Sequence, residues 1–168
     1  IGGECFANCD KLISISIPPS VAVLGAKCFN GCGNLTSISI PSSVSVLREL
    51  CFCHCSNLRS LFIPSSVSAL GELCFAACNN LTSISIPTNL SVLSFDCFYY
   101  CTNLKSITIS KKLWNKERLG LSDDNQVHFQ EENEPVQMNI AHQENRIELT
   151  DSSFEDISET FSYGDKNL

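Results

Sequence analysis

The sequence of 168 residues contains little of what most function classes require. Charged residues make up only 17% of it, and the formal net charge is −7. This negative balance argues against nucleic acid or an anionic membrane surface as a partner of the chain. No apolar run approaches the roughly 18 residues needed to span a bilayer, and no basic-then-apolar leader opens the sequence. We therefore expect no direct membrane insertion of this segment.

Groups suited to acid–base or phosphate chemistry are also scarce. The chain has three histidines, and two of them, His128 and His142, lie in the last third. No Gly-rich phosphate loop occurs in the sequence. Serine is plentiful, but no base stands beside it that could activate a hydroxyl. The sequence therefore predicts a protein that is not an enzyme and that needs no cofactor.

A repeat of 23 residues dominates the first two thirds of the chain. Each unit opens with Cys-Phe and continues to a Leu and an Ile-x-Ile pair (Leu-x-Ile in the third unit), and in the first four units a Pro follows, as in CFNGCGNLTSISIPSSVSVLREL. Phe recurs at positions 6, 29, 52, 75 and 98 and Pro at 18, 41, 64 and 87, whereas Ser110 stands where the fifth Pro would fall. A period without insertions indicates units that stack on their neighbours and share one core.

Each unit predicts a strand, a turn and a return segment. Ile38 and Ile40 alternate with Ser39, which is the pattern of a half-buried strand. Pro41 follows and ends the strand, because proline lacks a backbone donor. The Cys-Phe-x-x-Cys stretch has the spacing of one helical turn, with both Cys directed inward. If each unit forms one rung of a stack and neighbouring parallel strands lie about 4.8 Å apart, five rungs would span roughly 20 Å.

The motif L-x-x-I-x-I-P-x-S-V-x-x-L followed by C-F-x-x-C resembles the BspA-like leucine-rich repeat family over about residues 1–113. The resemblance implies a leucine-rich-repeat solenoid with stacked parallel β-strands on its concave face and short turns or one-turn helices on the return side. It also implies adhesion or recognition at a cell surface. Membership of such a family is a better guide to fold than to ligand.

The end of the repeat divides the chain into three segments. Residues 1–113 are the predicted solenoid of about five units, the first of them incomplete. Leu113, Trp114 and Leu121 predict a capping helix over residues 114–121, because an open rung leaves a bare sheet edge. Acidic side chains outnumber basic ones thirteen to six after residue 110. Residues 122–168 are therefore expected to form an acidic, loosely folded or disordered tail.

Ten of the eleven cysteines occupy the two Cys columns of the repeat. We expect buried free thiols, which behave as small apolar side chains. A disulfide framework is the alternative, although the parallel Cβ vectors of stacked rungs disfavour it. The eleventh, Cys53, lies in the cluster Cys51-Phe52-Cys53-His54-Cys55, where Cys51 and Cys55 already point inward, so no metal site is expected. Cys53 itself is expected to be an exposed, oxidisable thiol.

The remaining candidate for function is the predicted concave face. A ladder of Ser and Thr is interrupted there by four residues, Arg59, Phe62, Ile13 and Lys105, and Arg and aromatic residues are common interface anchors. These four are the predicted ligand-binding residues of a non-enzymatic module that binds a protein or glycan at a cell surface. Two alternatives stay open: an intracellular scaffold, favoured by unpaired thiols, and an ice- or polymer-binding Ser/Thr face.

Overall fold

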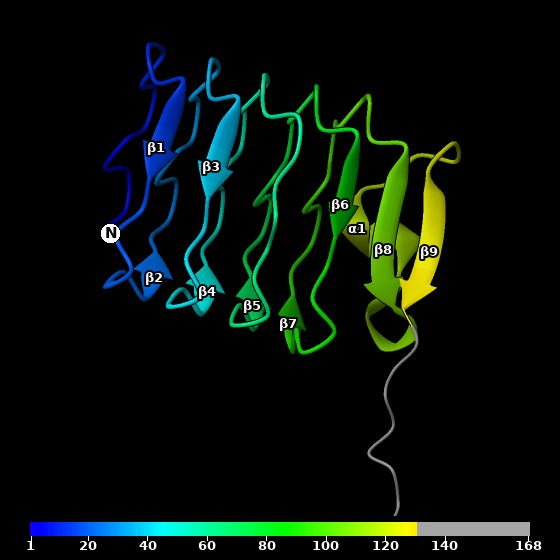
Figure 1. The fold of residues 1–168 in the computed structure, drawn as a ribbon. Coiled ribbons are helices and arrows are strands. Elements are labelled where there is room, and N and C mark those ends of the chain that lie inside the picture. Colours follow the sequence, from blue (N-terminus) through cyan, green and yellow to red (C-terminus); the bar gives the residue numbers. More distant parts are fainter. Residues whose placement is uncertain (131–168) are drawn as a thin grey trace, which may run out of the picture. The chain divides into compact units, whose positions relative to one another are not determined.

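The computed structural model describes residues 1–130, which fold as a parallel β-solenoid (Figure 1). This confirms the fold class inferred from the repeat. One side carries longer strands, which we call the face strands: β1 (Ser14–Ser16), β3 (Ser37–Ser39), β6 (Ser83–Ser85), β8 (Ser106–Ser110) and β9 (Gln126–Gln130). A second row holds two-residue strands, which we call the return strands: β2 (Val23–Leu24), β4 (Val46–Leu47), β5 (Ala69–Leu70) and β7 (Val92–Leu93).

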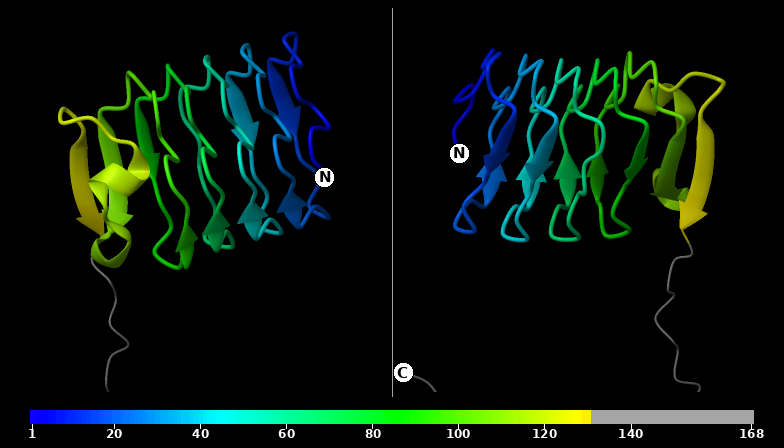
Figure 2. Two further views of the ribbon diagram at one scale, coloured as in Figure 1. Left: turned by 180° about the vertical axis from the view of Figure 1, so that it is seen from behind. Right: turned by 45° about the horizontal axis from the view of Figure 1, so that its top comes forward.

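Strand pairing follows the repeat closely. The pairs β1–β3, β2–β4, β4–β5, β5–β7 and β6–β8 are all parallel and join residues one repeat apart, such as Ser14 with Ser37. Only the last pair, β8–β9, spans a shorter interval, with Ser106 opposite Gln126. The two rows run side by side along the solenoid in both further views (Figure 2). The 23-residue period therefore fixes the register directly.

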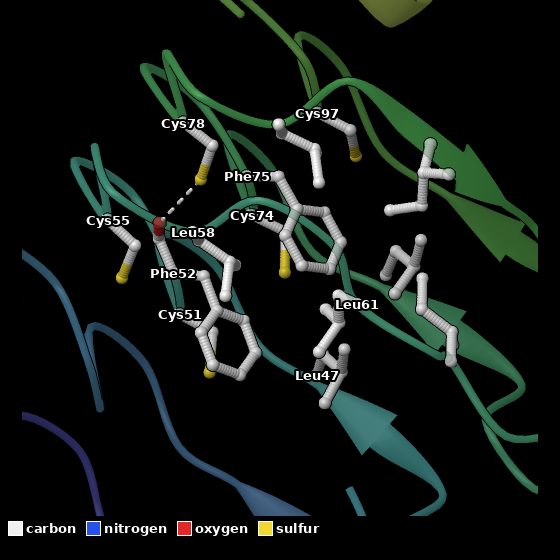
Figure 3. Packing of buried hydrophobic residues seen from close by; sticks show 14 of the residues in the cluster. Leu47, Cys51, Phe52, Cys55, Leu58, Leu61, Cys74, Phe75, Cys78 and Cys97 are labelled. Atoms are coloured by element: carbon white, nitrogen blue, oxygen red, sulfur yellow. Dashed lines mark hydrogen bonds between the residues drawn. The ribbon is translucent and has the colours of Figure 1, made fainter. Parts of the chain in front are cut away.

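The core is a column of stacked rings surrounded by Leu, Ile, Val and Cys. The Phe rings of the Cys-Phe pairs in neighbouring units lie 5.2 to 5.7 Å apart, measured between ring centroids, and are almost parallel. Phe29, Phe52 and Phe75 are fully buried. From the second unit on, the sulfur of the second Cys in each Cys-Phe-x-x-Cys stretch donates to a Phe carbonyl of the preceding unit, as Cys78 does to Phe52 at 3.2 Å (Figure 3). The Cys-Phe segment therefore links successive rungs by both packing and hydrogen bonds.

The Cys-Phe segments form turns, the first of the two forms expected for the return side. In the third unit the turn is flanked by Leu50 and His54, whose φ angles are 56° and 60°. Side chains other than Gly rarely adopt this left-handed region. It is populated here because the N–H groups of Leu50 and His54 each donate to a carbonyl of the next unit at 2.8 Å. The backbone thus bonds across rungs instead of along a helix axis.

All eleven cysteines lie within the described residues and none forms a disulfide. From Cys28 onward they are buried, whereas Cys5 is exposed and Cys9 is half-buried at the first unit. The prediction of an exposed Cys53 is wrong, because its side chain is only 5% exposed. Neighbouring rungs cover this position: the Gly31 N–H donates to the Cys53 carbonyl at 2.8 Å. Burial also raises the pKa of the Cys53 thiol.

We expect native alkylation to label Cys5 first and to leave Cys53 unmodified on the same time scale. Reaction requires an accessible thiolate, and burial raises the pKa of Cys28 to about 11. The measurement is iodoacetamide labelling of the folded protein at pH 8, followed by peptide mass spectrometry. Labelling of Cys53 as fast as Cys5 would mean that the third turn is open to solvent.

The end of the repeat differs from the predicted capping helix over residues 114–121. A 3-10 turn, η1 (Lys111–Leu113), is followed by the short helix α1 (Lys116–Leu119), which lies behind β8 on the side opposite the face strands (Figures 1 and 2). Leu119 is fully buried, and its carbonyl accepts the Phe98 N–H at 3.0 Å. Gly120 ends the helix with φ 69°, and an added Cβ would lie 3.1 Å from the Tyr99 backbone. Only glycine suits both requirements.

Strand β9 corrects the start of the predicted loose tail, which was placed at residue 122. Residues 126–130 pair with β8 along its full length, and Val127 lies opposite Ile107. Both Ile107 and Ile109 are fully buried, so β9 covers an edge that would otherwise be open. The remainder of the predicted tail, residues 131–168, lies outside the described residues.

Ser110 takes the place of the fifth proline and is fully buried, and its hydroxyl has no hydrogen-bond partner in the described structure. We expect Ser110→Ala to stabilise the protein by about 1 kcal/mol, because burying an unpaired hydroxyl costs about 1–3 kcal/mol. The exposed Ser39→Ala is the matched control and should change the free energy of unfolding little. Urea denaturation compares the three proteins. A loss of stability in Ser110→Ala would indicate that the hydroxyl has a partner, such as a water molecule.

Candidate functional site

The strand face is the outward side of the face strands together with residues 58–63 of the third unit. Its serines are exposed while the isoleucines between them are inward: in β3, Ser37 and Ser39 are exposed and Ile38 is buried. Residues 58–63 form no regular strand; only a bridge between Phe62 and Ser85 joins them to β6. The face strands consequently form two sheets, β1–β3 and β6–β8–β9, on either side of the third unit.

Arg59 and Phe62 both point outward from the third unit. Phe62 is 76% exposed, the largest exposure among the large hydrophobic side chains of residues 1–130, and Arg59 is also exposed. Leu58, Leu61 and Ile63 are buried beneath them. Arg59 and Phe62 are thus exposed three residues apart on one rung, where the sheet is interrupted.

Ile13 and Lys105 are exposed as well, but they do not join Arg59 and Phe62 in one site. Together with Thr36, Arg59 and Thr82 they form a column along the solenoid, linked by backbone bonds such as Lys105 N–H to the Thr82 carbonyl at 2.9 Å. Ile13 and Lys105 each lie two rungs from Arg59, or roughly 10 Å. The four predicted residues thus share a face, and only Arg59 and Phe62 share a rung.

The charges on this face have one sign. Among the strand positions of the first five units, the only ionisable side chains are Arg59 and Lys105. Strand β9 adds His128 opposite Thr108, a neighbour that the sequence did not predict. An acidic partner surface would complement such a face.

Within the described part of the chain, no group of three or more His, Cys, Asp or Glu side chains is placed to hold a metal ion. None of the described helices has the length and apolar character needed to cross a bilayer.

A second group of candidate residues was missed by the sequence reasoning. Phe95, Tyr99 and Tyr100 are exposed near the end of the repeat, and the Arg118 guanidinium lies 5.0 Å from the centre of the Phe95 ring. The signal was visible in the sequence, because Tyr99 and Tyr100 occupy turn positions that hold smaller side chains in all four other units. Two cavities of about 270 and 420 Å³ lie in this part of the molecule.

Stacked rungs in the register of a 23-residue period define a leucine-rich-repeat solenoid. A family model of the BspA type leucine-rich repeat region matches residues 1–118 with six copies. The chain therefore belongs to the BspA-type leucine-rich repeat family, as its motif had indicated. No curated protein sequence matches it.

Solved structures of leucine-rich repeat proteins share the fold. The chain is similar to the T. pallidum protein TpLRR (24% identity, TM-score 0.64, covering 77% of this chain and 65% of that one). A Bacteroides ovatus leucine-rich repeat protein gives 24% identity, a TM-score of 0.60 and coverage of 77% and 40%. The pneumococcal vaccine antigen PcpA gives 21% identity and a TM-score of 0.70, and the match covers 77% of this chain and 33% of that one. The chain thus spans less than two thirds of each, and the likeness extends to the fold alone.

Proposed function

We propose that the protein is a non-enzymatic binding module that holds a macromolecular partner on its strand face, with Arg59 and Phe62 as the anchor. The observation that carries the proposal is the 76% exposed Phe62 ring, with Arg59 exposed three residues before it, on a face built mostly of Ser and Thr. Leaving such a ring in water forgoes about 1.5–3 kcal/mol of burial free energy. A partner that covers the ring recovers this free energy.

The chemistry of the anchor favours a protein over a glycan. Phe62 offers apolar area with few rotatable bonds, and Arg59 can bind a carboxylate through two parallel hydrogen bonds. The surrounding serines are short and exposed, so they allow a broad, flat contact. A partner with an apolar hollow next to an Asp or Glu would satisfy both anchor residues.

The proposal also includes the cellular location of the protein. A cell-surface role is supported by family membership and by similarity to a protein named as a vaccine antigen. An intracellular scaffold is the second candidate, and eleven free cysteines favour it, because thiols persist in reducing compartments. Counting free thiols in the native protein isolated from its source under non-reducing conditions would separate the two.

The test compares wild type with the double variant Arg59→Ser, Phe62→Ser, which restores the polar ladder. Both proteins are applied to an extracellular-protein array and to a glycan array, with Lys112→Gln as a control away from the strand face. Signals from the true partner should persist in Lys112→Gln and fall about thirtyfold or more in the double variant, as expected for loss of a hot spot of about 2 kcal/mol. Undiminished signals in the double variant would refute the anchor, and glycan signals alone would refute a protein partner.

A further inference from the structure

The row of return strands is held by a hydrogen-bond ladder that advances one repeat at a time. Ser45, Ser68 and Ser91 each donate their N–H to a carbonyl of the preceding unit at 2.9 Å. A second series runs beside it, from Arg48, Gly71 and Ser94, at 2.8 to 3.1 Å. If this pattern continued, backbone N–H groups of the fifth unit would donate to the carbonyls of Ser91 and Leu93.

The ladder stops at β7. Trp114, one repeat after Ser91, donates its N–H to Lys111 within its own turn at 3.2 Å. No backbone N–H of residues 1–130 donates to the Ser91 or Leu93 carbonyl. Because η1 and α1 replace a fifth return strand, β7 ends the row, as Figure 1 shows. Its outer edge therefore carries two free acceptors two residues apart, the spacing that one edge of a β-strand presents.

A cavity of about 420 Å³ lies along this edge, within the roughly 300–1,000 Å³ range of ligand pockets. One wall is Ser91, Val92 and Leu93, and the other is formed by residues 112–115 and Arg118. Val92 is 50% exposed, whereas its counterparts in the preceding units are half-buried. The cavity thus occupies the space in which the missing strand of the fifth unit would run.

The charge of the far wall is positive. Lys112 and Arg118 line the cavity and both are exposed. From Lys111 to Leu119 the sequence holds four basic residues and one acidic residue, Glu117, in a chain whose net charge is −7. This local reversal of sign favours an anionic occupant.

We propose that the edge of β7 binds an extended acidic peptide, which adds to the return sheet as the strand that the fifth unit lacks. Two peptide N–H groups, two residues apart, donate to the Ser91 and Leu93 carbonyls. Alternate side chains then face inward against Leu93 and Leu113, while the intervening acidic side chains lie among Lys112 and Arg118. Strand addition of this kind derives affinity from main-chain bonds and specificity from alternate side chains. This site is independent of the strand face.

The experiment titrates a fluorescent six-residue peptide of alternating Glu and Val against the full chain. We expect binding that is lost when Lys replaces Glu. Methylating the backbone nitrogens of one alternating set should weaken binding at least about tenfold, because two hydrogen bonds are removed. Methylating the other set, whose N–H groups point away from β7, should be tolerated.

Variants of the protein place the site. Lys112→Gln should weaken binding about twofold to fivefold, as expected for an exposed ion pair, whereas Lys105→Gln on the strand face should leave it unchanged. Amide NMR signals of residues 91–93 should shift on titration. Equal binding of the Lys peptide, or equal tolerance of both methylated sets, would overturn the proposal. Binding of tri-galacturonate but not of the peptide would overturn it in favour of an acidic saccharide.

Discussion

Replacing Phe52 by Ala should lower the free energy of unfolding by about 3–5 kcal/mol. Its ring is fully buried and lies between those of Phe29 and Phe75, with centroids 5.4 and 5.5 Å away. The same slot holds a Phe ring in every unit, so the stacked neighbours have no spare volume with which to fill the cavity. Urea denaturation followed by circular dichroism measures the change, and we expect the melting temperature to fall by roughly 10 °C.

Two variants control for the position and the volume of the ring. Phe6→Ala should cost clearly less, because Phe6 is half-buried at the first unit and stacks on one neighbour only. Phe52→Leu keeps most of the volume and should cost less than Phe52→Ala. A cost below about 1 kcal/mol for Phe52→Ala would show that the Cys-Phe turn does not form the core.

Alkaline pH should unfold the solenoid. Burial raises the pKa of Cys28 to about 11 and that of Cys97 to about 12, from an ordinary value of 9.0, and it also raises those of Cys51, Cys55 and Cys74. In the unfolded chain these thiols lose their protons near pH 9, whereas in the folded state they keep them. The stabilisation is therefore complete below pH 9 and is lost as the pH rises toward the folded-state values.

Each such thiol contributes a loss of about 1.4 kcal/mol per pH unit above 9. With five of them, the loss between pH 7 and pH 10 is on the order of 7 kcal/mol, comparable with the total stability of many domains. Urea denaturation at pH 7, 9 and 10 under reducing conditions measures it. In Cys74→Ala, the unfolding free energy should fall less steeply with pH, by the contribution of about one proton. Equal stability at pH 7 and pH 10 would indicate that the thiols are not buried.

Much of the fold could be predicted because the repeat constrains it many times over. Ile38 and Ile40 alone would suggest a strand, but the recurrence of this pair at one period, with Leu61 in place of the first Ile in the third unit, also fixes parallel pairing and register. The Cys-Phe turns were harder to predict. Their left-handed residues, such as Leu50 and His54, are stabilised by bonds to the next unit, and local spacing does not reveal bonds between units.

The end of the repeat was predicted less well, because the motif decays there. Strand β9 has one Val and one Phe in an otherwise polar segment, so its pairing with β8 depends on an available edge and not on its own pattern. The outward positions of Arg59 and Phe62 followed from the inward assignment of Leu58, Leu61 and Ile63, which are buried. The cavity beside β7 could not be predicted, because it results from η1 and α1 leaving the row of return strands.

The most direct test of the binding function is the affinity of the face double variant, Arg59→Ser with Phe62→Ser, for the partner that wild type selects on the protein array. Surface plasmon resonance should give a dissociation constant about thirtyfold or more above that of wild type. Lys112→Gln, which alters only the return edge, should bind that partner with wild-type affinity. An unchanged dissociation constant for the double variant, with a loss in Lys112→Gln, would contradict the assignment of the binding site to the strand face.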